Sequence, residues 1–274
     1  MTRIKFTKMH GNGNDFIVIN ALEQNYPDLS SKAKALCDRR FGIGCDQLLV
    51  VKPSETADLR MLIYNNDGSE VEMCGNGIRC FALYAKKHKL ISGEELTVET
   101  LGGIKKIKIL HQLVEVDMGE PILKAPLIPV NLDGMVIGKS MDLNGQHYSI
   151  TCISMGNPHC VLFVENVDDY AVKKIGPIFE NYSLFPKKIN VEFAQILDKS
   201  SIKLRVWERG AGETLACGTG ACATVVAAVL NGHTSRKVNV RLPGGDLEIT
   251  WSEKDNHVYM LGAGVEVFEG EIDI

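Results

Sequence analysis

Two cysteines, Cys74 and Cys217, stand where their thiols could act as proton donors and acceptors. Each opens a Cys-Gly-X-Gly loop that leads into a segment with helical spacing of apolar residues, and each has a glutamate four residues before it, Glu70 or Glu213. A thiol at a helix N-terminus lies near unpaired backbone N–H groups, whose partial positive charge stabilises the thiolate. Because the pKa of an ordinary cysteine is about 8.5, a modest decrease makes such a thiol a usable base at neutral pH. We interpret the two glutamates as capping residues.

The glycines of the two loops indicate what the thiols would act on. Gly75, Gly77, Gly218 and Gly220 carry no side chain, so a ligand can approach the backbone N–H groups closely. A carboxylate between two helix starts would accept hydrogen bonds from both, and these donors would stabilise the charge that develops when the neighbouring carbon loses its proton. A thiolate on one face and a thiol on the other would invert that carbon. One such loop alone is a weak signal, because glycines that only let a helix pack tightly look the same.

The two loops belong to an internal duplication. They are 143 residues apart, and the same shift aligns polar and apolar positions elsewhere in the chain. The aligned pairs are Asn14 with Asn157, Gln47 with Asn190, Asn65 with Glu208, Tyr64 with Trp207 and Ile19 with Leu162. A repeat of half the chain is far longer than the repeats of solenoid proteins. We therefore predict two similar halves with both cysteine loops in one cleft between them.

Each half reads as several short strands and a buried helix. The residues from Ser30 to Arg39 have helical spacing, with Ser30 or Ser31 as the expected N-cap. The segment Ala221–Leu230 is apolar nearly all round, which predicts a buried helix that ends at Asn231-Gly232. This pattern predicts an α+β fold of two pseudo-symmetric domains, each a curled mixed or antiparallel sheet around a central helix. The expected domains are 1–118 and 119–263, with the crossing in a segment that holds Pro121, Pro126 and Pro129.

The composition is that of an ordinary globular protein and excludes several functional classes. Of the 274 residues, 45% are hydrophobic and 23% are charged, and the formal net charge is -4, which gives no basic surface for nucleic acid. The longest apolar stretch, Ala221–Leu230, is too short to cross a bilayer. Residues Met1–Phe16 lack the apolar core of a signal peptide. We expect a cytoplasmic protein that binds neither nucleic acid nor membrane.

The remaining cysteines give no sign of a metal or redox centre. Cys37, Cys45, Cys152 and Cys160 lie in apolar segments and are expected to be small buried hydrophobic residues. No Cys-x-x-Cys pair occurs, so the signature of a zinc ribbon or a thioredoxin-type site is missing. We expect no metal and no cofactor.

Four motifs resemble those of the diaminopimelate epimerase family, in chain order and over essentially the whole chain. They are MHGNGNDF at residues 9–16, CGNGIRC at 74–80, GNPH at 156–159 and ERGAGETLACGTG at 208–220. The resemblance implies an enzyme that converts LL-2,6-diaminopimelate to the meso form without a cofactor, in the synthesis of lysine and peptidoglycan precursors. It also implies an active site between two domains, a homodimer, and a terminal strand, 264–274, that crosses to complete the first domain.

The same resemblance assigns roles to individual residues. Cys74 and Cys217 would be the acid–base pair, and His159 and Glu208 would tune their pKa values. The residues expected to contact substrate are Asn14, Gln47, Asn65, Gly75, Asn76, Asn157, Asn190, Glu208, Arg209, Gly218 and Thr219. Arg209 suits a carboxylate because its planar fork binds both oxygens, whereas the asparagines could also be ordinary turn residues. Asn12 and Cys45 depart from the small or apolar residues common in the family.

Three other functions fit part of the pattern. A proline racemase or hydroxyproline epimerase resembles this family in fold and cysteine pair, but the GNPH motif argues against it. A dinucleotide-binding protein would share Gly218-Thr219-Gly220, yet the chain lacks an acidic residue about 20 positions later to hold a ribose. A thiol redox protein would use Cys74 and Cys217 as a disulfide switch. We also expect air to inactivate an epimerase by joining these thiols, an expectation that fails if both thiols stay free in inactive protein.

Overall fold

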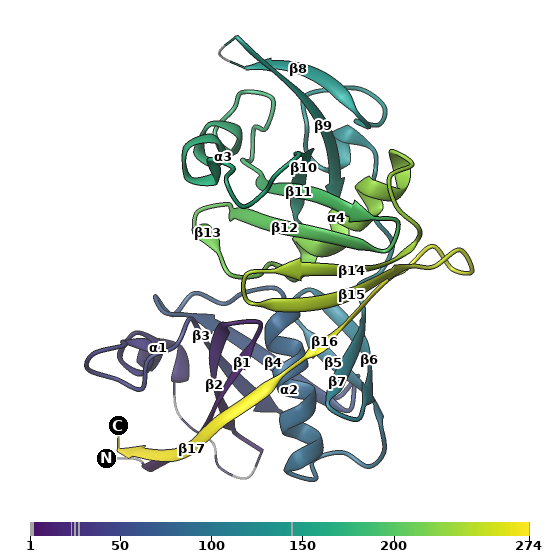
Figure 1. Cartoon of the computed structure of the whole chain (residues 1–274). Helices are drawn as coiled ribbons and strands as arrows, with labels where there is room; N and C mark the ends of the chain where they lie inside the picture. The colour runs from purple at the N-terminus through teal and green to yellow at the C-terminus, as the bar shows by residue number, and fades with distance from the viewer. Residues whose placement is uncertain (1–2, 23, 25, 27, 144, 274) are drawn as a thin grey trace. The chain divides into compact units, whose positions relative to one another are not determined.

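The computed structural model describes residues 3–22, 24, 26, 28–143 and 145–273, which divide into two compact units (Figure 1). Unit 1 comprises Met1–Asp117 and Leu261–Ile274, and unit 2 comprises Met118–Met260. Each unit combines a mixed β-sheet with α-helices, so the chain has the α+β architecture that its sequence predicts.

The sheet of unit 1 has the strand order β17–β1–β2–β3–β4–β5–β6–β7. β2 and β3 run parallel, as do β4 and β5, and every other neighbouring pair is antiparallel. Each parallel pair is joined by a helix, since parallel neighbours need a crossover connection. The elements are β1 (Arg3–Gly11), β2 (Asn14–Asn20), α1 (Leu29–Cys37), β3 (Gln47–Lys52), β4 (Leu59–Asn65), α2 (Gly75–Lys87), β5 (Glu95–Thr100), β6 (Gly103–Leu110), β7 (Leu113–Asp117) and β17 (Val265–Asp273).

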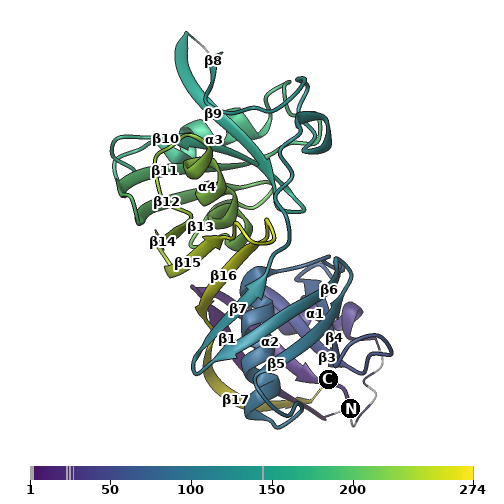
Figure 2. The ribbon, with the colours of Figure 1, turned by 90° about the vertical axis from the view of Figure 1, so that its right-hand side faces the viewer.

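Helix α2 is the centre of unit 1 (Figure 2). It packs against β1, β2 and β3 and also against β6, β7 and β17, so the sheet curls around it. The apolar residues that follow Cys74 at helical spacing, Ile78, Phe81, Ala82 and Ala85, are fully buried. This burial fixes the rotation of the helix and therefore the direction in which its first turn points.

Unit 2 repeats this design around α4. Its sheet has the order β8–β9–β10–β11–β12–β14–β15, with β13 also paired to β12, and α4 packs against β9, β10, β11 and β15. The elements are the 3-10 helix η1 (Ala125–Leu127), β8 (Lys139–Leu143), β9 (Gln146–Ser154), β10 (Pro158–Phe163), α3 (Val172–Glu180), β11 (Asn190–Asp198), β12 (Ser201–Glu208), β13 (Gly212–Thr214), α4 (Gly218–Leu230), β14 (Lys237–Leu242) and β15 (Gly245–Trp251). The prediction of a buried helix that ends at Asn231 and Gly232 is confirmed, because Asn231 is its C-cap and Gly232 has φ 71°.

The duplication is visible in the bounds and the register of the elements. Adding 143 to the first and last residue numbers of β1, α1 and α2 gives those of β9, α3 and α4, respectively. Phe16 pairs with Gln47 in unit 1, and His159 pairs with Asn190 in unit 2, so the parallel pairs also keep the same register. The two units are therefore copies of one fold at the level of individual residues.

The start of α1 differs from the prediction. Its N-cap is Asp28 rather than Ser30 or Ser31, and the Asp28 carboxylate accepts hydrogen bonds from the Ser31 N–H at 3.2 Å and the Ser30 hydroxyl at 3.0 Å. The helix begins earlier because Leu29 and Ala33, one turn apart, are both buried.

The end of the chain belongs to unit 1. β16 (Val258–Ala263) leads out of unit 2, and β17 then pairs antiparallel with β1, from Arg3 opposite Asp273 to His10 opposite Val265. In unit 2 the corresponding place beside β9 is taken by β8, which directly precedes β9 in the chain. The four cysteines at positions 37, 45, 152 and 160 are buried, as their apolar surroundings predict.

Candidate active site

Both predicted acid–base cysteines are N-cap residues of the central helices. Cys74 precedes α2 with φ -135° and ψ 114°, and Cys217 precedes α4 with φ -123° and ψ 112°. The first-turn N–H groups that follow an N-cap have no partner within the helix. Cys74 is half-buried and its sulfur accepts a hydrogen bond from the Gly77 N–H at 3.4 Å, whereas only 6% of Cys217 is exposed.

The other predicted residues lie together at one end of the strands in each sheet. Asn14 begins β2, Gln47 begins β3, and Asn65 ends β4. Because β2 and β3 are parallel and β4 runs the opposite way, these three positions lie at the same end of the three strands. The same topology in unit 2 places Asn157, Asn190 and Glu208 together, while Gly75, Asn76, Gly218 and Thr219 form the first turns of α2 and α4.

In unit 1 the predicted residues form two hydrogen-bonded groups. The Cys74 sulfur lies 3.6 Å from Asn14 Oδ1, and the same oxygen accepts from Asn76 Nδ2 at 3.4 Å. Separately, Gln47 Nε2 donates to Asn65 Oδ1 at 3.0 Å. The other amide atom, Gln47 Oε1, is buried and has no hydrogen-bond partner among the described residues. A buried acceptor of this kind suits a ligand that brings an N–H donor.

A charged cluster supports the Asn14 side of this group. Arg39 donates to Asp15 through both terminal nitrogens, at 2.9 and 2.7 Å, and to Asp46 at 2.6 Å. Lys8 adds a further bond to Asp15 at 2.7 Å. Burial alone would raise the pKa of Asp15, but the hydrogen bonds and charges of Arg39 and Lys8 hold that pKa well below its ordinary value. Asp15 is therefore a fixed anion of the framework.

In unit 2 a chain of contacts runs from a buried carboxylate to Cys217. His159 Nδ1 lies 2.7 Å from Glu192 Oε1, and His159 Nε2 lies 3.0 Å from Asn157 Oδ1. Asn157 Nδ2 donates to the Thr219 hydroxyl at 3.2 Å, and that hydroxyl lies 3.5 Å from the Cys217 sulfur. Since an amide oxygen only accepts, His159 Nε2 is the donor in its hydrogen bond to Asn157.

Glu192 is a site residue that the sequence reasoning missed. Its side chain is fully buried on β11, and burial raises its pKa against the opposing effect of His159. A signal for it was present, because the 143-residue shift aligns Glu192 with Leu49. A carboxylate at a strand position whose copy is an apolar residue indicates a function confined to one half.

The environment of Cys217 raises its pKa, in the direction opposite to the helix-end effect considered from sequence. Burial is the largest cause, and the carboxylates of Glu208 and Glu192 raise the pKa further. The Thr219 hydroxyl opposes them. In this conformation Cys217 is therefore held as the thiol, the form that donates a proton.

The remaining predicted residues of unit 2 contact the protein framework. Asn190 is buried, donates to the Pro158 carbonyl at 2.8 Å and accepts from the Arg209 N–H at 2.9 Å. The exposed Arg209 side chain donates to the Lys187 carbonyl at 3.0 Å. Glu208 accepts from the Thr214 hydroxyl at 2.5 Å. These contacts leave each side chain with further hydrogen-bonding capacity, so their substrate contacts stay a prediction.

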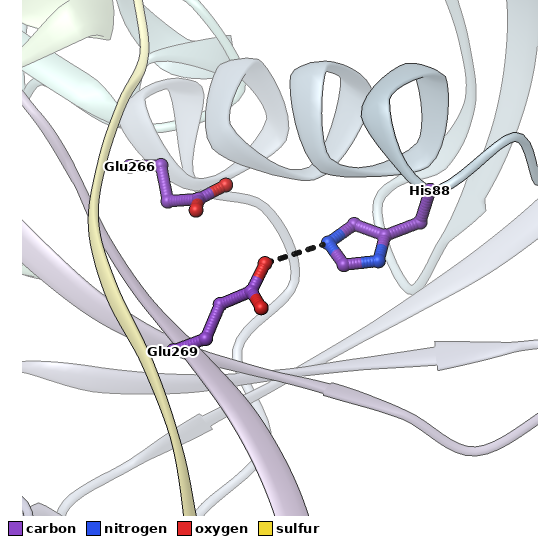
Figure 3. Close-up of side chains that lie close together, drawn as sticks. All are labelled: His88, Glu266 and Glu269. Carbon is purple, nitrogen blue, oxygen red and sulfur yellow. Dashed lines mark ion pairs between the residues drawn. The ribbon is translucent and has the colours of Figure 1, made fainter.

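One group of side chains in the described part of the chain has the spacing of a metal site, and it lies away from the cysteines. His88, Glu266 and Glu269 place one ligand atom each within 4.8 Å of one another (Figure 3). The Lys87 ammonium already lies 2.5 Å from Glu266 and 3.3 Å from Glu269 and offsets one of their two negative charges. The group sits at the C-terminal end of α2, roughly 20 Å along the helix from Cys74 at 1.5 Å per residue. We interpret it as a clamp between α2 and β17.

Solved structures with the same fold define the class of the protein. The chain matches a crystal structure of a phenazine biosynthesis protein of the PhzF family from Bacillus anthracis with a TM-score of 0.74 and 18% identity, covering 100% of both chains. It matches a probable proline racemase from Agrobacterium radiobacter with a TM-score of 0.71 and 12% identity, covering 99% of this chain and 93% of that one. The protein is thus a duplicated α+β protein of this fold, with a cysteine at the start of each central helix.

The chain belongs to the diaminopimelate epimerase family. The sequence profile of that family matches residues 6–124 and 151–267. A diaminopimelate epimerase from Acetivibrio thermocellus is 52% identical over 277 residues, which cover 99% of each chain. None of the helices in the described ranges has the length and apolar character that a bilayer crossing requires.

Proposed function

We propose that this protein is a diaminopimelate epimerase that inverts one α-carbon of LL-2,6-diaminopimelate to give the meso form. The observation that carries the proposal is the full-length match to that family, together with the cysteine N-caps of α2 and α4. Its product, meso-diaminopimelate, would be used in the synthesis of lysine and peptidoglycan precursors.

The proposed mechanism uses Cys74 and Cys217 as a pair of opposite function. One cysteine, as thiolate, takes the α-proton from one face, and the other, as thiol, returns a proton to the opposite face. The roles exchange in the reverse reaction. The first-turn N–H groups of both helices, at Gly75, Asn76 and Gly218, Thr219, would bind the reacting carboxylate, because such groups favour an anion. They would also stabilise the carbanion-like transition state, so the mechanism requires no cofactor.

The far end of the substrate needs groups that recognise a second amino acid. Gln47 Oε1 is a buried acceptor that suits an ammonium donor. Glu208, which replaces the Asn65 of the other copy, adds a negative charge, and Arg209 can pair with the distal carboxylate. Asn14, Asn157 and Asn190 would complete the set. His159 and Glu208 would tune the thiols, and the electrostatic effect of Glu208 on Cys217 supports that role.

A proline racemase-type activity is the second candidate, because a protein with that description shares the fold. The sequence identity to it is 12%, against 52% to a diaminopimelate epimerase. We also propose that the enzyme is a homodimer and acts in the cytoplasm, as the family resemblance implies.

The test is α-proton exchange in D2O with LL-diaminopimelate, followed by NMR under reducing conditions. The variants are Cys74→Ala and Cys217→Ala, and the matched control is Cys222→Ala, a buried cysteine one turn into α4. We expect inversion with deuterium incorporation in the intact protein and the control, and no inversion in either site variant. Exchange of proline or hydroxyproline with no effect on diaminopimelate would favour the second candidate, and exchange of no amino acid would refute the catalytic assignment.

A further inference from the structure

Asn14 lies between two groups of different hydrogen-bonding character. Its Nδ2 donates to Asp46 Oδ2 at 2.8 Å, while its Oδ1 faces the Cys74 sulfur at 3.6 Å. An ionised carboxylate can only accept hydrogen bonds. Asp46 therefore requires the nitrogen of the Asn14 amide on its own side, which leaves the oxygen on the side of the cysteine.

A second charged residue, Arg79, orients the side-chain amide of Asn76, which contacts Asn14. Arg79 is fully buried on α2, and its Nη2 donates to Asn76 Oδ1 at 3.0 Å. A guanidinium can only donate, so Asn76 turns its nitrogen toward Asn14 Oδ1. The two amides are thus oriented from both ends, by an anion at Asp46 and a cation at Arg79.

Asp46 is held in place by its own partners. Arg39 donates to its Oδ1 at 2.6 Å, so each carboxylate oxygen has a different donor. The backbone N–H of Asp46 donates to Asp15 Oδ1 at 3.0 Å, and the backbone N–H of Asp15 donates to Asp46 Oδ2 at 3.2 Å. Asp46 is thus fixed relative to β2, where Asn14 stands.

In unit 2 the amide of the corresponding asparagine, Asn157, has the opposite orientation. Asn157 turns its oxygen toward His159 and its nitrogen toward Thr219, on the side of Cys217. The residue that the 143-residue shift aligns with Asp46 is Ile189, which is buried. In unit 1 a carboxylate contacts the asparagine directly, whereas in unit 2 a histidine does, and the two copies present different atoms to their cysteines.

We propose that Asp46 is a positioning residue for Cys74, which acts by holding the Asn14 amide with its oxygen toward the thiol. An acceptor in this place stabilises the S–H form, whereas an N–H donor there would stabilise the thiolate. Asp46 thereby sets the ease with which Cys74 loses its proton. The proposal rests on the proposed function only in treating Cys74 as the proton-transfer group of unit 1.

Other charged groups also act on this site. Among the elements packed against α2, β1 brings Lys8, β2 brings Asp15, and the segment before β3 brings Arg39 beside Asp46. Arg79 lies on α2 itself. β17 brings Glu266 and Glu269 at the far end of the helix. A test must therefore separate the orientation of Asn14 from the loss of a negative charge.

The test measures alkylation of Cys74 by iodoacetamide as a function of pH, in the intact protein and in Asp46→Ala. Only the thiolate reacts, and Cys74 is the one cysteine of the tryptic peptide 61–79, so mass spectrometry reports it alone. Loss of Asp46 removes one of the two groups that orient Asn14 and leaves only the longer 3.4 Å bond from Asn76 to oppose a turn of its nitrogen toward the sulfur. We expect alkylation at neutral pH to rise about fivefold, the factor by which one ordinary hydrogen bond changes an equilibrium.

A double-mutant cycle with Asn14→Ala separates the two effects. If Asp46 acts through the amide, Asp46→Ala has little effect once Asn14 is removed. An equal change with and without Asn14 would show that only the charge matters, and no change in either background would also overturn the proposal. Asp58→Ala, which removes an exposed carboxylate that accepts hydrogen bonds from Thr97 in the same unit, is the matched control and should leave Cys74 unchanged.

If the Asp46→Ala variant does not fold, Asp46→Asn is measured in its place. The charged Arg39, the nearer donor, would take the oxygen of the new amide, and the weaker 3.2 Å bond from the Asp15 N–H would be lost. The nitrogen of the new amide would then face Asn14 and turn that amide over. The expected change in Cys74 alkylation has the same sign as for alanine, and an unchanged rate would refute the proposal. Alkylation needs no turnover, so absent epimerase activity in the intact protein would count against the proposed function alone.

Discussion

Replacement of Gly220 by alanine should damage unit 2, whereas the same change at its copy, Gly77, should be tolerated. A Cβ at Gly220 would lie 2.8 Å from Glu192 Oε1 and 3.3 Å from the Cys217 sulfur. The Glu192 carboxylate cannot move aside freely, because His159 holds it at 2.7 Å in a fully buried position. A Cβ at Gly77 would meet only side-chain carbons, the nearest at 3.3 Å, which can shift slightly.

The magnitude follows from two opposing terms. Alanine in place of a helical glycine contributes up to ~1 kcal/mol of helix propensity, while an overpacked core costs ~1–3 kcal/mol. For Gly220→Ala the second term is larger, so we expect a net loss of ~1–2 kcal/mol in the free energy of unfolding of unit 2. For Gly77→Ala the two terms nearly cancel, and we expect a change within ~0.5 kcal/mol.

Urea unfolding followed by tryptophan fluorescence measures this difference selectively. The two tryptophans of the chain, Trp207 and Trp251, both lie in unit 2. With a urea dependence of about 2 kcal/mol per molar, the midpoint for Gly220→Ala should fall by about 0.5–1 M, while Gly77→Ala leaves it unchanged. Activity of Gly220→Ala should also fall, because the added carbon displaces the Cys217 sulfur. A midpoint for Gly220→Ala at or above that of the intact protein would show that the Glu192 contact does not constrain the helix.

Three further predictions address stability and pH dependence. Glu208→Gln removes a negative charge that raises the pKa of Cys217, so iodoacetamide should modify Cys217 at lower pH, and an unchanged pH profile would exclude that charge. Gly176→Ala places a Cβ 2.4 Å from the Trp207 ring and should destabilise unit 2 by at least ~1–3 kcal/mol; a urea midpoint equal to that of the intact protein would contradict it. The lowered pKa of Asp15 stabilises the fold above the ordinary carboxyl pKa and loses that effect as pH falls through the lower, folded-state pKa. The stability difference between the intact protein and Asp15→Asn should therefore shrink in acid, which urea titrations at several pH values would show.

The duplication and the two helix starts could be predicted from sequence because both are patterns of residue type that need no knowledge of spatial contacts. A shift of 143 residues needs only residue types, and a Cys-Gly-X-Gly loop before an apolar helix marks an N-terminus by its own chemistry. The burial of α2 followed from the helical spacing of its apolar residues, and that of α4 from its apolar character nearly all round. The structure confirms these features.

The network behind the cysteines could not be predicted because it depends on contacts across strands. Asp46 reads as a turn residue, and only the β2–β3 pairing brings it to Asn14. Glu192 reads as one polar residue in an apolar strand, and its partner His159 lies 33 positions earlier. The direction of the pKa shift at Cys217 depends on burial, which a motif does not reveal. Residue types and the family resemblance thus pointed to the cysteines and the residues around them, whereas Asp46, Glu192 and the electrostatics of the site required the fold.

The place of β17 beside β1 has a consequence for how the protein is made. Unit 2 is one continuous segment, Met118–Met260, whereas unit 1 needs both Met1–Asp117 and Leu261–Ile274. During synthesis from the N-terminus, β1 therefore waits without its outer neighbour while the whole of unit 2 emerges. Unit 2 needs no later segment of the chain to complete its sheet, but unit 1 is completed only after β17 has left the ribosome. The half of the protein that is translated first is thus the half that is finished last.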